Sequence, residues 1–123
     1  NRNYEADWGE KWQGLLVEGN MEGKGDGTTN YDNQANQLIA GNLKGKLLIT
    51  HGSIDNNVPP SNTMLVVEAL IKANKDFDMI LFPNKRHGYG DMTNYMTRKR
   101  WDYFITHLRN EVPPKEFDLT NFK

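Results

Sequence analysis

Two short apolar runs, each followed by a Gly or Pro break and then a titratable residue, most constrain the fold of this chain. The first run lies within Lys46–Thr50, and Gly52 and Asp55 follow it. A short, continuously apolar run that stops at a glycine is typical of a buried strand in a parallel sheet. Loops just beyond the carboxyl ends of such strands are where α/β folds bind ligands. The pattern therefore makes Asp55 a candidate site residue.

The second run, Phe77–Phe82, repeats this arrangement, with a proline break and then His87 in a Gly-rich loop. Between the two runs, Pro59 and Pro60 mark the start of a helix that is predicted to extend to about Ala73. Apolar residues recur along it at helical spacing, which predicts a mostly buried helix. A strand, a helix and a strand of these lengths predict a right-handed parallel βαβ unit. The fold class is therefore α/β, with parallel strands and flanking helices.

Two further helices are predicted. One is short, over Tyr31–Ala40, and follows a glycine-rich loop; the other begins at Asp91–Thr93 and ends at Val112–Pro114. The expected packing face of the last helix consists of apolar residues at helical spacing, namely Met92, Tyr95, Met96, Trp101, Phe104, Ile105 and Leu108. Two strands and a few helices cover a sheet poorly, so we expect exposed apolar surface or association into a homo-oligomer.

Charge and composition argue against several classes of function. The chain has 15 basic and 16 acidic residues and no basic stripe, which argues against a nucleic-acid partner. It has no cysteine, so it has no disulfide, no thiolate metal site and no cysteine nucleophile. No apolar run approaches the length of about 18 residues that a membrane span needs. Because the chain begins with Asn1 rather than Met, we interpret it as a processed or truncated piece.

An Asp and a His in loops after successive strands are typical of the orienting acid and general base of a hydrolase triad. His87 would move a proton between a serine and the leaving amine, and Asp55 would hold its ring. Alternatively, Asp55 caps a loop and His87 is an ordinary surface histidine. His51, Asp55 and His87 also offer zinc ligands, but no tight H-x-x-x-H pair supports a metal site. We therefore expect no metal, and expect His51 to pack at the strand end and His107 to be structural or exposed.

These motifs resemble those of a known family. His51–Val58 is similar to the HG-x-x-D-x-x-V motif in the peptidase domain of the prolyl oligopeptidase family, on its dipeptidyl-peptidase IV side. Arg86–Gly88 is similar to the histidine loop of that family, and the separation of 32 residues from Asp55 to His87 fits its spacing. The resemblance extends over residues 4–116. It implies the C-terminal portion of an α/β-hydrolase fold, a serine-peptidase triad that includes Asp55 and His87, and no cofactor.

The resemblance also implies a site for a peptide substrate. Asn57 would help hold a backbone carbonyl of the substrate, and Val58 would line a pocket for proline. Tyr4, Trp8 and Trp12 recur at spacing i, i+4, i+8, which is typical of a helix face packed on a core. In dipeptidyl peptidases a Tyr-x-x-x-Tyr pair lines the proline pocket, and Tyr4 and Trp8 fall on those positions, with Trp8 in place of the usual tyrosine. The parent enzyme would then cleave peptides after proline.

The nucleophile is expected upstream of this chain. The two serines, Ser53 and Ser61, do not stand in a G-x-S-x-G elbow, and triad residues in this fold follow the order Ser, Asp, His. We therefore expect residues 1–123 to be a C-terminal fragment that is inert alone. Its partner would be the upstream part of the same polypeptide, with the serine, the oxyanion donors and a propeller domain. The resemblance favours a periplasmic or secreted location. The alternative is a catalytically inactive binding or interaction module with a hydrolase-like fold.

Overall fold

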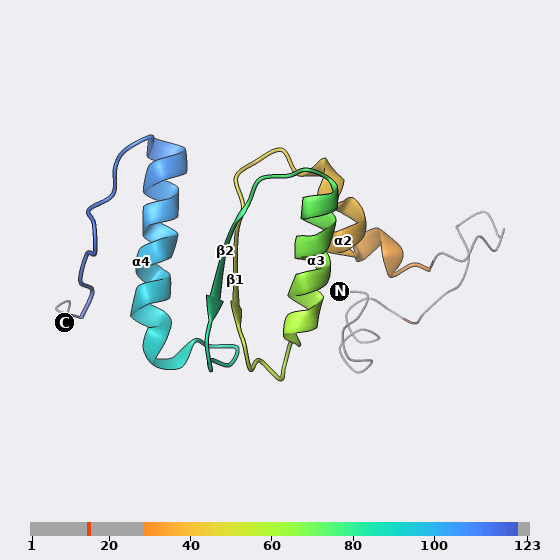
Figure 1. Cartoon of the computed structure of the whole chain (residues 1–123), viewed down its shortest axis with the longest axis horizontal. Coiled ribbons are helices and arrows are strands. Elements are labelled where there is room, and N and C mark those ends of the chain that lie inside the picture. The colour runs from red at the N-terminus through yellow and green to blue at the C-terminus, as the bar shows by residue number, and fades with distance from the viewer. Residues whose placement is uncertain (1–14, 16–28, 121–123) are drawn as a thin grey trace. The chain divides into compact units, whose positions relative to one another are not determined.

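A computed structural model of the chain describes residue 15 and residues 29–120 (Figure 1). The chain divides into two compact units. One contains Ser61–Asp76 and the residues up to Gly45, and the other contains Lys46–Pro60 and the residues from Phe77 onward. Asp55 and His87 both belong to the second unit.

A two-stranded parallel sheet lies at the centre of the second unit. Strand β1 (Leu48–Gly52) pairs with β2 (Asp78–Phe82), with Leu48 opposite Asp78 and Gly52 opposite Phe82. This pairing confirms the α/β class with parallel strands. β1 is shifted by two residues from the predicted Lys46–Thr50, because the pairing continues through His51 and Gly52. Both strands therefore end at the same level, and the loops that follow them leave from the same edge of the sheet.

A helical segment follows the second loop and packs beside β2 (Figure 1). It consists of a 3₁₀ turn, η3 (Gly90–Met92), the α-helix α4 (Thr93–Phe104) and a π-helical turn, η4 (Ile105–Arg109). Its anchor is Phe82, which is 2% exposed and lies 6.1 Å from the Tyr95 ring, centroid to centroid. Met96 of α4 is also buried. These contacts hold the start of α4 against the sheet, close to the loop that contains His87.

The predicted packing face of the last helix was largely wrong. Met96 is buried, but Trp101, Phe104 and Leu108 are exposed, with Leu108 at 75%. The physical reason is the width of the sheet, because two strands of five residues offer too little surface to cover a helix of this length. Helical spacing identified the apolar side of the helix but not what covers it.

The first unit contains short helices and one longer one. Its elements are η1 (Asp32–Gln34), α2 (Asn36–Ile39), η2 (Ala40–Asn42) and α3 (Pro60–Lys72). The single helix predicted over Tyr31–Ala40 is broken, because Ala35 takes an extended backbone conformation between η1 and α2. The start of α3 at Pro60 agrees with the proline signal in the sequence.

Among the described residues of the first unit, few side chains are buried. Leu70 of α3 is 1% exposed, and Ala35 and Ala40 are also buried. The prediction of a mostly buried α3 was wrong, since Met64 and Ile71 are exposed. The expectation of exposed apolar surface is therefore met in both units. Among residues 15 and 29–120, no helix combines the length and apolar character needed to cross a membrane.

Candidate active site

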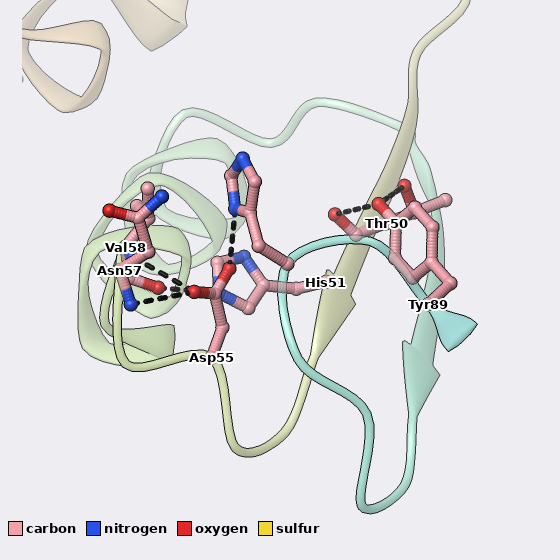
Figure 2. A network of polar contacts seen from close by, with 7 residues as sticks. Thr50, His51, Asp55, Asn57, Val58 and Tyr89 are labelled. Carbon is pink, nitrogen blue, oxygen red and sulfur yellow. Dashed lines mark hydrogen bonds and ion pairs between the residues drawn. The ribbon is translucent and has the colours of Figure 1, made fainter.

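Asp55 lies three residues beyond the end of β1, in a loop that satisfies one of its carboxylate oxygens (Figure 2). Asp55 Oδ1 accepts hydrogen bonds from the backbone N–H groups of Asn57 at 2.9 Å and Val58 at 3.0 Å. The Asp55 N–H in turn donates to the Gly52 carbonyl at 3.2 Å. Asp55 is buried. The loop therefore presents the second oxygen, Oδ2, in a fixed direction.

His87 forms a hydrogen bond with that second oxygen. Its Nδ1 lies 2.8 Å from Asp55 Oδ2. An ionised carboxylate can only accept, so Nδ1 carries the proton in this contact and Nε2 is the basic nitrogen of the neutral ring. The His87 side chain is 62% exposed, whereas that of Asp55 is 3% exposed. The arrangement thus has a buried acid, and a histidine that an incoming group can reach.

The surroundings of Asp55 favour its charged form. Burial is the largest single influence and opposes ionisation, but the hydrogen bonds from the Val58 N–H, His87 Nδ1 and the Asn57 N–H outweigh it together. The pKa of Asp55 therefore lies below its ordinary value. A carboxylate that stays ionised at neutral pH can fix the tautomer of the neighbouring imidazole and stabilise the imidazolium.

A second histidine braces the Asp55 loop from within. His51 is 8% exposed, and its Nε2 lies 2.9 Å from the Val58 carbonyl oxygen. Because a carbonyl only accepts, Nε2 carries the proton and donates. The same nitrogen lies 3.7 Å from Asp55 Oδ2, too far for a good hydrogen bond. In the described part of the chain, no three metal-ligating side chains are grouped as a metal site requires.

The two loops are joined to each other by hydrogen bonds beyond the Asp55–His87 contact. The Ser53 N–H donates to the Phe82 carbonyl at 3.0 Å, and the Ile54 N–H donates to the Lys85 carbonyl at 3.2 Å. The Asn84 N–H donates to Ser53 Oγ at 2.8 Å. These bonds continue the β1–β2 pairing past the ends of the strands, so the loops that contain Asp55 and His87 form one connected structure.

Close backbone packing and an ion pair also fix the His87 loop. A Cβ atom placed on Gly52 would lie 2.6 Å from the Arg86 carbonyl oxygen, closer than real side chains approach, so the loop can pass here because residue 52 is glycine. Lys85 Nζ lies 2.5 Å from Asp91 Oδ1. That ion pair joins the two ends of the segment that contains His87.

Sequence reasoning missed one pair of residues at the site. The Tyr89 hydroxyl lies 2.7 Å from Thr50 Oγ1, joining the His87 loop to β1 (Figure 2). These residues are 39 positions apart, and neither belongs to a recognisable motif. The only signal in the sequence was a tyrosine between two glycines, Gly88 and Gly90. A large aromatic side chain is unusual in a turn that is otherwise made of glycine.

The four remaining predicted site residues divide into two pairs. Asn57 and Val58 lie beside Asp55, and their backbone N–H groups contact it. Asn57 is exposed and Val58 is half-buried, so both side chains border the loop that presents the acid. Tyr4 and Trp8 lie outside the described residues, and their place in a pocket stays a prediction.

Comparison with known proteins gives consistent matches. Residues 1–111 match the family model described as the prolyl oligopeptidase family. The chain is 27% identical over 96 residues to "Dipeptidyl peptidase family member 1" of Caenorhabditis elegans, which covers 78% of this chain and 11% of that protein. It is similar to the crystal structure of Porphyromonas gingivalis dipeptidyl peptidase 4, with a TM-score of 0.50 and 44% identity over 56% of this chain and 10% of that one.

These matches extend the assignment of the fold. At 44% identity, the similarity to a solved peptidase identifies the parallel strands and helices described above as part of an α/β-hydrolase fold. The chain spans about a tenth of the length of the relatives it matches, since it covers 11% of one and 10% of the other.

Proposed function

Since this chain belongs to the prolyl oligopeptidase family, we propose that it supplies the acid–base pair of a serine peptidase whose nucleophile lies upstream in the same polypeptide. The observation that carries the proposal is the contact between Asp55 Oδ2 and His87 Nδ1 at 2.8 Å. Two backbone N–H groups of the loop donate hydrogen bonds to the other carboxylate oxygen of Asp55, and the His87 side chain is mostly exposed. This is the arrangement that a general base requires when the group it deprotonates comes from another segment.

The proposed mechanism assigns one role to each residue. His87 Nε2 takes the proton of the serine hydroxyl as its oxygen attacks the carbonyl carbon of the scissile peptide bond. The resulting imidazolium is stabilised by the Asp55 carboxylate, which holds the Nδ1 proton without accepting it. His87 then gives the proton to the amine nitrogen as the C–N bond breaks, leaving an acyl-serine. Water completes the cycle, with His87 again as the base.

The upstream position of the serine has support within the chain. The Ser53 hydroxyl accepts the Asn84 N–H and so belongs to the loop connection. Ser61 lies inside α3. Residues 1–123 would then be the C-terminal fragment of a catalytic domain, and the upstream part would contribute the serine, the oxyanion donors and a propeller domain. The short span relative to known relatives supports this interpretation.

The proposed substrate is a peptide with proline before the scissile bond. Two relatives are named dipeptidyl peptidases, which supports release of dipeptides. Asn57 and Val58 stand next to Asp55, where a backbone-binding amide and an apolar pocket wall would meet a substrate at the reacting carbonyl. Tyr4 and Trp8 would complete the proline pocket, because a flat ring with no amide N–H suits aromatic walls.

A second candidate function is an inactive interaction module. The exposed apolar residues of the last helix, Trp101, Phe104 and Leu108, favour it, because large exposed apolar patches mark contact surfaces. The upstream sequence separates the two candidates. A G-x-S-x-G elbow there supports the peptidase, and its replacement supports the module.

A fluorophosphonate reagent, which labels activated serines, tests the proposed function in the full-length polypeptide. We expect a single labelled serine upstream of residue 1, labelling that is lost in His87→Ala, and normal labelling in the control His107→Ala. His107 packs on the Tyr103 ring in the last helix, at 4.3 Å between ring centroids. The 123-residue chain alone should be neither labelled nor able to hydrolyse esters. Esterase activity of that chain that disappears in His87→Ala would overturn the upstream nucleophile.

A further inference from the structure

Tyr89 has an unusual backbone conformation for an aromatic residue. It lies two residues after His87 with φ at +59° and ψ at −7°, in the left-handed region that favours glycine. Gly90 next to it also has a positive φ, at +52°. A bulky residue persists in such a conformation only where its surroundings hold it, and such positions cluster at functional sites.

The side chain of Tyr89 provides that restraint through contacts with both strands. Its hydroxyl lies 2.7 Å from Thr50 Oγ1 and donates toward the Thr50 carbonyl at 3.5 Å. Its ring lies 4.7 Å from the ring of Phe82, centroid to centroid, at an angle of 49°. Thr50 belongs to β1, and Phe82 is the buried last residue of β2. Figure 2 shows the Thr50–Tyr89 contact together with the contacts of Asp55.

The backbone of Tyr89 determines the shape of the turn that contains His87. The Tyr89 N–H donates to the Arg86 carbonyl at 3.3 Å and closes that turn. The Tyr89 carbonyl accepts the Met92 N–H at 3.0 Å and connects the turn to η3. The left-handed conformation of Tyr89 sets the direction in which the chain passes from the first turn to the second, and the contacts of the side chain maintain it. A shift of Tyr89 would therefore move the Cα atom of His87.

The His87 side chain cannot correct such a shift by itself. It is 62% exposed, so little packing holds its ring. The hydrogen bond to Asp55 fixes the position of Nδ1. The direction in which Nε2 points then depends on the position of the His87 Cα atom. Because acid–base catalysis needs the base within hydrogen-bond reach of the proton it takes, small displacements of this backbone lower the rate.

We infer that Tyr89 is a positioning residue, which anchors the His87 turn to β1 through Thr50 and so aims the proposed general base at its serine. This inference rests on the proposed function. It assigns Tyr89 no contact with substrate. Its hydroxyl acts through Thr50, its ring through Phe82, and the result is the placement of His87.

Four variants of the full-length polypeptide test the inference by hydrolysis of a dipeptide anilide that has proline before the scissile bond. Tyr89→Phe keeps the ring and removes the hydroxyl, and Thr50→Val removes its partner. We expect each to lower kcat on the order of tenfold with little change in KM, because binding groups stay in place. The kcat of the double variant should be no lower than that of either single variant, because the two substitutions remove the same hydrogen bond. The control is Tyr95→Phe, which removes a hydroxyl from the other tyrosine on Phe82 and should retain normal kcat.

Tyr89→Gly separates positioning from folding. Glycine adopts a φ near +59° without strain, so the turn can still form. The contacts of the side chain with Thr50 and Phe82 are both lost. We expect kcat to fall on the order of a hundredfold while the protein still folds, because relief of backbone strain offsets part of the stability lost with the two contacts. Normal kcat in Tyr89→Gly or in Tyr89→Phe would overturn the inference.

A spectroscopic measurement keeps the inference separate from the proposed function. The His87 Nδ1 proton, held by Asp55, should give a strongly deshielded proton NMR signal, absent in Asp55→Asn. We expect Tyr89→Phe to broaden or shift this signal and Tyr95→Phe to leave it unchanged. If the wild-type polypeptide neither hydrolyses the anilide nor reacts with fluorophosphonate, the proposed function fails. An unchanged signal in Tyr89→Phe overturns the role of Tyr89 whatever the activity.

Discussion

The Cα atom of Gly52 lies so close to the Arg86 carbonyl that a methyl group on it would stand 2.6 Å from that oxygen. Residue 52 ends the strand before Asp55, and residue 86 immediately precedes His87. Contact between these two backbones is what allows the two loops to meet. The absence of a side chain at Gly52 is therefore a requirement of the site.

Gly52→Ala should displace the His87 loop. We expect a loss of about 1–3 kcal/mol in the free energy of unfolding, as for other overpacked positions. In the full-length polypeptide, kcat should fall by roughly two orders of magnitude, since the base is moved from its partner. Gly45→Ala is the matched control, because its added methyl group would meet nothing within 4 Å. Equal effects at the two glycines would contradict this account.

His51 is predicted to act as a brace for the Asp55 loop. His51→Ala removes the donor to the Val58 carbonyl and should cost about 1–3 kcal/mol in the free energy of unfolding, measured with urea. His51→Gln can place an N–H near the same oxygen and should recover part of that loss. If glutamine is no better than alanine, the hydrogen bond is not what His51 contributes.

Asp55 should make stability depend on pH in the acid range. Its pKa is lower in the folded chain than the value of about 3.9 expected when unfolded, so its contribution is fully present above that value. It is lost as pH falls through the lower, folded pKa. The difference in unfolding free energy between wild type and Asp55→Asn should therefore narrow below about pH 4.

Urea titrations of both proteins at several pH values measure that difference. Asp118→Asn is the control, since Asp118 also accepts hydrogen bonds, from Thr120, but is exposed, and exposed carboxylates contribute little. A difference for Asp55→Asn that stays constant down to about pH 2.5 would mean that its ionisation does not stabilise the fold.

Trp8 is predicted to select for proline. In the full-length polypeptide, Trp8→Ala should lower the preference for proline over alanine before the scissile bond by about tenfold, because part of an apolar pocket wall is lost. Turnover of the alanine substrate should change much less, since the chemistry at His87 is intact. Trp12→Ala, four residues further along the sequence, is the control. An unchanged ratio of kcat/KM values for Trp8→Ala would make Trp8 a structural residue.

The contact between Asp55 and His87 could be anticipated from sequence because it depends on a simple geometric rule. Parallel strands end at one edge of a sheet, so loops after successive strands come together there. The end of β1 was harder to predict, because His51 and Gly52 have the composition of a loop although they continue the strand pairing. Strand boundaries depend on the partner strand, which local patterns do not show.

Other features depend on contacts between distant residues and could not be predicted. The Thr50–Tyr89 bond joins positions 39 residues apart, and the close approach of Gly52 to Arg86 depends on the path of a later loop. The prediction that the apolar side of α4 is a packing face was wrong for a different reason. Trp101 and Phe104 have the spacing of a packing face, but spacing does not say whether a covering surface exists.

Four consecutive residues, Thr50 to Ser53, each contact a loop of the site. Thr50 meets Tyr89, His51 meets Val58, Gly52 meets the 85–86 backbone and Ser53 meets Asn84. One tetrapeptide therefore helps to position both the acid and the base, through the loops that it contacts. A loop graft that keeps this tetrapeptide and the segments it contacts should therefore keep the geometry of the proposed proton transfer. We therefore expect diversification within such proteins to spare this tetrapeptide and to accumulate in the segments that surround the substrate.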